Sequence, residues 1–316
     1  MNNEYRRNHY IPECYLKGFS DNEKMVWIYN KKISKSYPKS VNDIFVEKDF
    51  YLIDESFIPE EGRGMISYKS IEYDFFAKQI ESQYADFLKH VKSFTEDLKK
   101  QDLSYTRIIP EDWVERISLQ LLIQYIRTPE ARRKALELLN TSRFCLDIFA
   151  NSPFLSEKEK EDYKLESQKT YGDVIDHFMV LFNKEKVVDP ICSILHNKIW
   201  SIYFSPNADF FTSDSPVILE REGQNKEVGF MEFNLSNLNI TYPVTRNFLV
   251  RLWDRESYKE LVPFDRIIRV VDEEFVKCEN IRQYVWANNE IVSSNNNSTL
   301  FKTIVNIQGK ELYCKH

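Results

Sequence analysis

The chain has 316 residues with a formal net charge of −6, and 42% of the residues are hydrophobic, which is enough to bury a sizeable core. The acidic balance argues against a broad nucleic-acid-binding face, because such a face needs clustered Lys and Arg. None of the seven glycines forms a G-x-G-x-x-G or G-x-x-x-x-G-K-[ST] motif, so the sequence excludes the Rossmann and P-loop nucleotide sites. The start of the chain is polar and its longest apolar-rich run is Ile117–Ile126, so we expect a cytoplasmic protein without a membrane span.

Residues 1–67 are predicted to form a small N-terminal sheet. A short helix is expected over Pro12–Phe19, since proline suits the first turn of a helix. Met25–Tyr29 and Ile44–Ile53 are rich in β-branched and aromatic residues and are predicted to be strands separated by a Lys/Ser/Pro loop.

Residues 68–198 are predicted to form a central helical bundle. Apolar residues recur there at helical spacing, and Thr128-Pro129-Glu130 has the order of an N-cap, a first-turn proline and a first-turn acid. The predicted helical segments are Tyr68–Phe94, Pro110–Ile126, Pro129–Phe149, Glu157–Lys164 and Val174–Phe182.

Residues 199–316 are predicted to form a mainly antiparallel sheet with a closing helix, Glu273–Trp286, capped by Asp272. The strands are grouped rather than alternating with helices, so the predicted fold class is α+β and the chain is expected to be a single compact unit. The predicted strands are Ile199–Phe204, Phe210–Thr212, Val217–Leu219, Leu238–Val244, Phe248–Trp253 and Ile267–Val271, with the tail Thr299–Ile307 returning as a further strand.

The cysteines and histidines predict neither a metal site nor a cofactor. The five cysteines lack C-x-x-C spacing and are best interpreted as reduced thiols. The histidines form no H-x-H or H-E-x-x-H pattern, so we expect no metal and no cofactor.

The segment Asn8-His9-Tyr10-Ile11-Pro12 contains the candidate acid or base. Imidazole titrates near neutrality, so His9 is the predicted catalytic group, with Tyr10 as a substrate-binding neighbour. The alternative is that His9 is a packed, hydrogen-bonded anchor, which is the commoner role of a lone histidine beside aromatic residues.

Gln124 and Arg127 are three residues apart and share one face of a predicted helix, so both are candidates to bind one ligand. Arg127 would equally suit a helix C-terminus for electrostatic reasons alone. Arg132 falls in the first turn of the next predicted helix, where the helix dipole disfavours a cation. It therefore calls for an anionic partner, for which Asp214, a bound phosphate or carboxylate, and Glu130 are the alternatives.

Asp214 lies between Ser213 and Ser215-Pro216 at the end of a predicted strand, which makes it the second candidate catalytic residue, with Ser213 as a candidate substrate contact. The alternative is an Asx-turn, in which the carboxylate only binds the nearby backbone. Nucleophile-elbow glycines are absent, so a serine hydrolase is not expected.

Three motifs carry a resemblance: Asn8-His9-Tyr10-Ile11-Pro12, Gln124-x-x-Arg127-Thr128-Pro129, and Thr212-Ser213-Asp214-Ser215-Pro216-Val217. In these motifs and their order the chain resembles the bacterial family called domain of unknown function 4238, over nearly its whole length. The resemblance implies no established activity. It picks out His9, Tyr10, Pro12, Gln124, Arg127, Pro129, Arg132, Asp214 and Pro216 without assigning them roles.

The sequence leaves two functions open. The first is a hydrolase acting on a phosphoester or nucleic-acid substrate, in a pocket between the helices and the late sheet, where Arg127 and Arg132 hold the anionic group and His9 or Asp214 handles the proton. The second is a non-catalytic binding or sensor module in a bacterial defence or mobile-element system, in which the same residues form a buried polar network and the partner is a protein.

Overall fold

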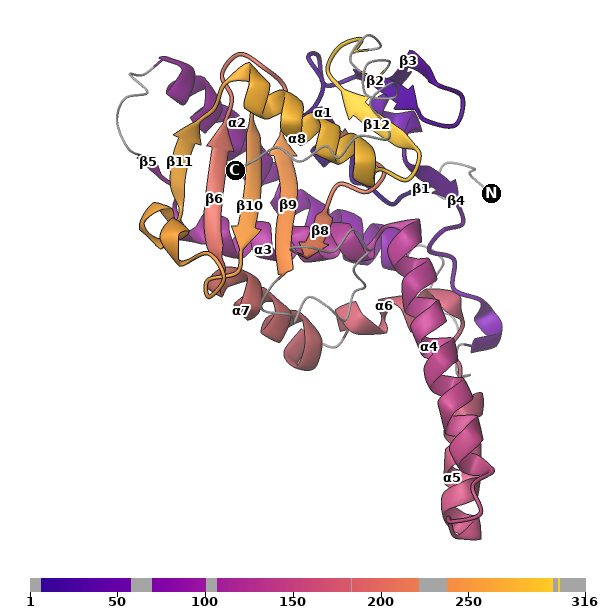
Figure 1. The fold of residues 1–316 in the computed structure, drawn as a ribbon. Coiled ribbons are helices and arrows are strands. Elements are labelled where there is room, and N and C mark those ends of the chain that lie inside the picture. The colour runs from indigo at the N-terminus through magenta and orange to yellow at the C-terminus, as the bar shows by residue number, and fades with distance from the viewer. Residues whose placement is uncertain are drawn as a thin grey trace.

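The computed structural model describes residues 7–57, 70–100, 107–182, 184–221, 238–297 and 301. It confirms the predicted α+β class: helices dominate the middle of the chain, a small sheet contains two of the N-terminal strands, and a larger, mostly antiparallel sheet forms in the C-terminal region (Figure 1). The α-helices are α1 (Glu13–Lys17), α2 (Ser82–Lys100), α3 (Glu111–Ile126), α4 (Pro129–Ala150), α5 (Glu157–Gln168), α6 (Asp173–Phe182), α7 (Asp189–Asn197) and α8 (Glu273–Trp286).

The larger sheet has the strand order β5-β11-β6-β10-β9-β8. Neighbouring strands are antiparallel except for β11 and β6, which are parallel. Its strands are β5 (Arg107–Ile108), β6 (Ile199–Phe204), β8 (Ile218–Arg221), β9 (Leu238–Thr245), β10 (Phe248–Trp253) and β11 (Ile267–Val270).

Helices cover both faces of this sheet: α8 crosses one face and α3 runs behind the other (Figure 1). Successive strand residues point to opposite faces, so Tyr203 of β6 packs on Phe275 of α8, with ring centroids 4.5 Å apart. Phe248 of β10 packs on Trp113 of α3 on the other side. Every residue of β6, β9 and β10 is buried as a result, and this explains the nearly continuous apolar sequence of β6 and β10.

The smaller sheet joins the two ends of the described chain. Its order is β3-β2-β12-β7, all antiparallel. The predicted small sheet is confirmed, but β12 was not predicted, and it places Ile291 opposite both Tyr29 and Ser213. Its strands are β2 (Met25–Asn30), β3 (Lys35–Ser40), β7 (Thr212–Ser213) and β12 (Glu290–Ser293).

Two N-terminal predictions are wrong. Ile44–Ile53 is not one strand: only β4 (Val46–Lys48) pairs, with β1 (Arg7–His9), because positive φ angles of 54° at Phe45 and 59° at Asp49 interrupt extended backbone on both sides. The expected Lys/Ser/Pro loop contains β3 instead, and its proline is tolerated because β3 is an edge strand.

The helical region follows the predicted order but does not form one bundle. The Thr128 hydroxyl accepts a hydrogen bond from the Ala131 N–H at 3.2 Å, and Pro129 occupies the first turn of α4, as predicted. Ser70–Glu81 is wound as a π-helix that leads into α2. Helix α7 was not predicted, and α4 and α5 leave the body of the molecule as a projecting hairpin (Figure 1).

Buried tyrosines dock the N-terminal segment on the larger sheet. The rings of Tyr15 and Tyr242 stack with centroids 5.6 Å apart, and the hydroxyls of Tyr84 and Tyr242 are 2.7 Å apart. The Tyr15 hydroxyl donates to the Pro243 carbonyl oxygen at 2.7 Å. One hydrophobic core therefore contains residues of α1, α2 and β9.

Apart from Phe301, the predicted strand Thr299–Ile307 lies outside the described residues. Cys278 is disulfide-bonded, which corrects the expectation of reduced thiols at that position, whereas Cys14, Cys145 and Cys192 are free. No helix within the described ranges has both the length and the apolarity to cross a membrane. We predicted one compact unit with three subregions, 1–67, 68–198 and 199–316, and this stays a prediction.

Candidate functional site

The break between α3 and α4 is built around the side chain of Arg127, which is fully buried. Its Nε donates to the Tyr51 hydroxyl at 3.0 Å, Nη1 donates to Glu81 Oε1 at 2.7 Å, and Nη2 donates to the His9 carbonyl oxygen at 2.7 Å. The guanidinium carbon lies 4.0 Å from the centre of the Phe76 ring. All three guanidinium nitrogens are therefore committed to partners inside the protein.

Glu72 adds a second carboxylate to this cluster. Its Oε2 lies 4.0 Å from Arg127 Nη2 and is a buried atom without a hydrogen-bond partner among the described residues. Burial raises the pKa of Glu72 to about 7. The positive charge of Arg127 lowers this pKa, whereas the negative charge of Glu81 raises it further. Burial alone would lower the pKa of Arg127, but Tyr51 and the two carboxylates raise it.

His9 meets Arg127 through its backbone. The antiparallel pairing of β1 with β4 sets the course of this segment, and the Tyr51 hydroxyl shares the His9 carbonyl oxygen at 3.1 Å. The ring Nε2 of His9 is buried without a hydrogen-bond partner in the described part of the chain. Burial lowers the pKa of His9, although Glu81 and Glu13 act in the opposite direction.

Tyr10 lies between aromatic rings and negative charge. Its ring packs on Phe45 and Phe50 with centroids 5.7 and 5.9 Å away. Burial raises the pKa of Tyr10, and the charges of Asp214 and Glu290 add to the effect. The Asn8-His9-Tyr10 segment therefore connects the Arg127 cluster to the surroundings of Asp214.

The Asp214 carboxylate clamps the turn that leads into β12. Its Oδ1 accepts from the Asn288 N–H at 2.9 Å, and its Oδ2 accepts from the N–H groups of Asn289 and Glu290 at 2.7 and 3.0 Å. Burial raises the pKa of Asp214 to about 6, although these donors oppose the shift. The neighbouring Ser213 hydroxyl accepts from Gln283 Nε2 at 2.6 Å, so both residues fasten local structure.

Arg132 contacts two rings, and Gln124 is buried in α3. The guanidinium of Arg132 stacks 3.6 Å from the centre of the Phe50 ring, and its Nε donates to His177 Nδ1 at 3.1 Å. His177 Nε2 is 2.7 Å from the Ile126 carbonyl oxygen. Burial and the Arg132 charge lower the pKa of His177 to about 3, so Arg132 contacts a neutral ring. Gln124 is buried, and its Nε2 has no hydrogen-bond partner within the described ranges.

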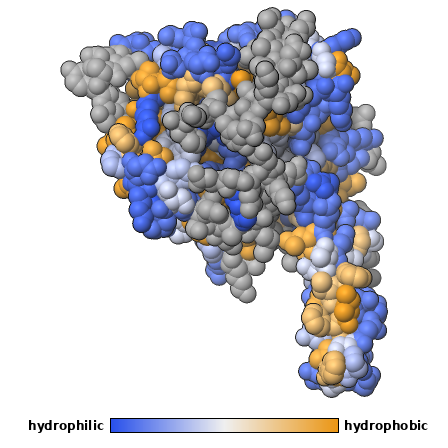
Figure 2. Space-filling model, in the orientation of Figure 1, coloured by the Kyte–Doolittle hydropathy of each residue, from blue (hydrophilic) through white to orange (hydrophobic). Residues whose placement is uncertain are grey.

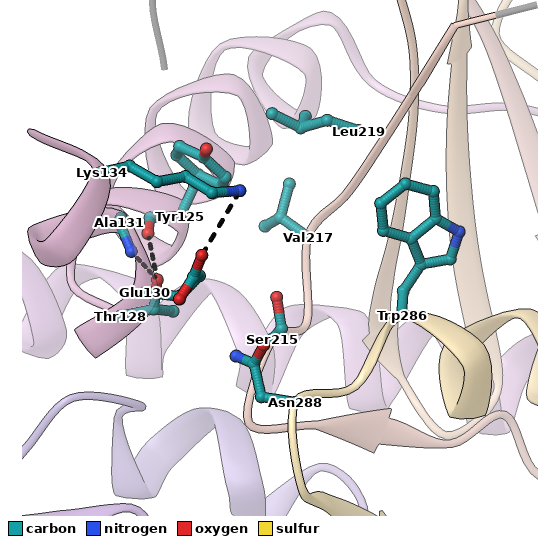
Figure 3. Close-up of a pocket in the computed structure, with 10 residues that line it drawn as sticks. All are labelled: Tyr125, Thr128, Glu130, Ala131, Lys134, Ser215, Val217, Leu219, Trp286 and Asn288. Carbon is teal, nitrogen blue, oxygen red and sulfur yellow. Dashed lines mark hydrogen bonds and ion pairs between the residues drawn. The ribbon is translucent and has the colours of Figure 1, made fainter. Parts of the chain in front are cut away.

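A small cleft, open to solvent, lies beside these clusters, and the space in it that the centre of a water molecule can reach is about 40 Å³. It lies between the α3–α4 break, the β7–β8 segment and the end of α8 (Figure 3). Lys134 and Glu130 point toward each other at one side, with Nζ and Oε1 3.6 Å apart, and Trp286 stands at the other (Figure 3). The lining residues are Tyr125, Thr128, Glu130, Ala131, Lys134, Ser215, Val217, Leu219, Trp286 and Asn288.

The residues that line the cleft are thus different from the predicted site residues, although several of them are close to those residues in the sequence. Two of the three motifs border the cleft, through Thr128 and through Ser215 and Val217. None of the predicted site residues lines it: His9, Tyr10, Gln124, Arg127, Arg132, Ser213 and Asp214 all lie elsewhere.

Residues 7–297 match the family described as "Protein of unknown function (DUF4238)". The chain belongs to this family. The match spans the three motifs and all three sheets of the described residues, so the DUF4238 unit includes the Arg127 cluster, the Asp214 clamp and the cleft. No curated protein and no solved structure matches the chain.

Sequence reasoning missed the acidic partners of Arg127 and the ring beneath Arg132. One feature of the sequence could have indicated that Glu72 and Glu81 are buried. Both lie among apolar residues of a predicted helix. Tyr51 and His177 gave no comparable signal. The described residues contain no group of His, Cys, Asp and Glu side chains arranged to hold a metal ion.

Proposed function

We propose that this DUF4238 protein is a non-catalytic binding module whose ligand occupies the cleft beside the α3–α4 break. The observation that carries the proposal is the commitment of the two charged residues best placed for chemistry. Arg127 donates three hydrogen bonds inside the protein, and Asp214 accepts three from backbone N–H groups. A phosphate-binding arginine needs donors that face the ligand, and a general base needs a lone pair that reaches the substrate.

The cleft lining favours a ligand with a flat apolar body and a polar edge. Val217, Leu219 and Ala131 are apolar, and the rings of Tyr125 and Trp286 supply aromatic surface. The Asn288 amide and the Ser215 hydroxyl add hydrogen-bonding groups next to Val217 (Figure 3). This composition suits a nucleobase or a similar heterocycle, which offers a flat face and amide-like edge groups.

The charges of the cleft do not favour a phosphate. The cation of Lys134 is offset by the carboxylate of Glu130 at 3.6 Å, and Arg133 also donates to Glu130. A bare phosphate would have to displace an existing ion pair rather than meet a waiting cation. The proposed ligand is therefore uncharged at the end that enters the cleft.

Calorimetric titration with adenosine and with AMP tests the proposal. We expect adenosine to bind and AMP to bind no more tightly. Asn288→Ala should weaken adenosine binding by about tenfold, the effect of one lost hydrogen bond. The matched control is Asn140→Ala on an exposed part of α4, which should bind as the unaltered chain does. Absence of adenosine binding, or an equal loss in both variants, would overturn the ligand assignment.

A second candidate function is acid–base hydrolysis at the Arg127 cluster, and a separate observation favours it. His9 Nε2 and Glu72 Oε2 are buried atoms without hydrogen-bond partners among the described residues, and the pKa of Glu72 is raised to about 7. Perturbed titratable groups of this kind gather at catalytic sites. Turnover of bis(p-nitrophenyl) phosphate by the unaltered chain, lost in a folded His9→Ala variant, would support hydrolysis and overturn the binding module.

A further inference from the structure

A row of ion pairs runs from the larger sheet toward the cleft. It begins with Arg251 of β10, whose Nη2 donates to both carboxylate oxygens of Glu279 of α8, at 2.9 and 2.7 Å. The Arg251 Nε also donates to the Thr241 hydroxyl at 3.1 Å. Both charged side chains are buried, each with 3% of its surface exposed. This pair keeps one geometry, because leaving either charge unpaired inside the protein is costly.

Arg282 extends the row to the edge of the sheet. It lies three residues after Glu279 on the same face of α8, and its Nε is 3.3 Å from Glu279 Oε2. Its Nη1 donates to both carboxylate oxygens of Glu220, each at 2.7 Å. Glu220 belongs to β8, an edge strand of the larger sheet. The carboxylate of Glu220 is therefore fixed by an arginine that is itself fixed from the core.

The row ends at the ring of Trp286, which lines the cleft. The indole Nε1 donates to Glu220 Oε1 at 3.1 Å, and the indole nitrogen is turned away from Val217 (Figure 3). Trp286 is half-buried and is the last residue of α8. Apolar side chains also gather along the α4–α5 hairpin (Figure 2), but Phe144 and Ile148 there offer a neighbour no polar atom to hold. The indole N–H gives Trp286 such an attachment.

We propose that Glu220 is a positioning residue for the cleft, which holds the Trp286 indole in the orientation that forms one aromatic side of the binding site. The inference rests on the function proposed above, in which the ligand has a flat apolar body. Strand geometry supports it, since successive residues of β8 point to opposite faces. Leu219 lines the cleft directly, while Glu220 reaches Trp286 on the side of α8.

The chemistry of the contact suits a carboxylate. The indole N–H and the Arg282 guanidinium can only donate hydrogen bonds, and an ionised carboxylate can only accept them. Without this acceptor a half-buried ring would sample several rotamers, and a ligand that stacks on it would have to order it. Ordering one side chain weakens binding by roughly two- to tenfold. Glu220 should therefore act on affinity through Trp286.

The orientation of the ring is tested first without a ligand. Nitrogen-15 NMR of the full chain detects the indole N–H groups, and Trp286→Phe identifies the Trp286 signal by its absence. We expect exchange of this N–H with water to accelerate by at least about tenfold in Glu220→Leu, the effect of one lost hydrogen bond to a charged group. Glu220→Gln, which keeps one acceptor oxygen, should give an intermediate rate. An unchanged rate in both variants overturns the inference.

The matched control is Glu274→Leu, which removes an exposed, ion-paired glutamate from the same helix and should leave the Trp286 signal unaltered. Far-ultraviolet circular dichroism checks that each variant is folded. Equal acceleration in the control variant would show that the helix as a whole has loosened, and this result would also overturn the inference.

Titration with adenosine then tests the effect on the cleft. Glu220→Leu should weaken binding by about two- to tenfold, but it should have no further effect in the Trp286→Phe background, because phenylalanine has no N–H to donate. An equal loss in both backgrounds would mean that Glu220 acts only on the fold, and it overturns the inference. If the unaltered chain binds no adenosine, the proposed function fails, and the exchange rate of the indole N–H alone decides whether Glu220 positions the ring.

Discussion

The guanidinium of Arg127 and the carbonyl oxygen of His9 are joined by a hydrogen bond of 2.7 Å across 118 residues of sequence. This bond fastens the N-terminal segment to the end of α3 in a place where the arginine side chain is fully buried. A cation in such a place must keep all of its partners, because losing any of them leaves an uncompensated buried charge. The stability of the fold should therefore be sensitive to every member of this cluster.

Arg127→Lys should lower the free energy of unfolding by about 3–5 kcal/mol, the range for breaking a buried ion pair. A lysine cannot supply three donors in the planar arrangement that Tyr51, Glu81 and the His9 carbonyl require. Urea unfolding measures the change. Arg133→Lys, at an exposed site on α4, is the matched control and should change stability by less than about 0.5 kcal/mol. Equal effects of the two substitutions would contradict the account.

Glu72→Gln should remove a pH dependence of stability. The pKa of Glu72 is about 7 in the folded protein and 4.5 as the ordinary value, so between these values the folded state binds the proton more tightly than the unfolded state. The native protein therefore loses stability as pH rises from 4.5 to 7, by on the order of 2–3 kcal/mol relative to the variant. Urea unfolding of both proteins across this range measures the difference. A constant difference would refute the raised pKa.

The His177 ring should stay neutral at pH 5. Its pKa is lowered to about 3, so its contribution to stability is complete above the ordinary pKa of about 6.5 and is lost as pH falls toward 3. Because Arg132 donates to Nδ1, the proton must reside on Nε2 and be donated to the Ile126 carbonyl. Nitrogen-15 NMR of the imidazole reports both the charge and the tautomer. A titration midpoint near that of the urea-unfolded chain would contradict this assignment.

Asp214→Asn should destabilise the protein by about 1–3 kcal/mol. The side-chain NH2 group of the asparagine would face a backbone N–H group and could not accept its hydrogen bond. Hydrogen exchange of the Asn288, Asn289 and Glu290 amides should accelerate together. Asp162→Asn, on an exposed part of α5, serves as the control with the same chemical change. Protection of the three amides that survives in Asp214→Asn would show that the carboxylate does not hold the turn.

The sequence predicted those elements whose own residues determine them. The β6 and β10 strands and helix α8 have the predicted bounds, because continuous apolar strands and the Asp272 cap are local signals. The break at Thr128-Pro129 was predicted for the same reason. By contrast β12 exists because β2 and β7 lie on either side of it, and such long-range pairing leaves little trace in a short segment.

The candidate site was harder to predict because its geometry depends on contacts between distant segments. The sequence indicated that Arg132 needs an anionic partner, yet its guanidinium contacts the rings of Phe50 and His177, and its Nη2 is buried without a hydrogen-bond partner among the described residues. The partners of Arg127 come from residues 9, 51 and 81, which no spacing rule connects. The cleft likewise combines α3, α4, β8 and the end of α8, so it is visible only once the fold is known.

The most direct test of the central claim measures phosphodiester turnover and unfolding free energy on the same preparations of the unaltered chain, Arg127→Lys and Asp214→Asn. Bis(p-nitrophenyl) phosphate is the probe, with and without added Mg²⁺ or Mn²⁺. The account predicts no turnover by the unaltered chain and a clear loss of stability in both variants. Turnover that disappears in variants as stable as the unaltered chain would contradict it and would identify these residues as catalytic.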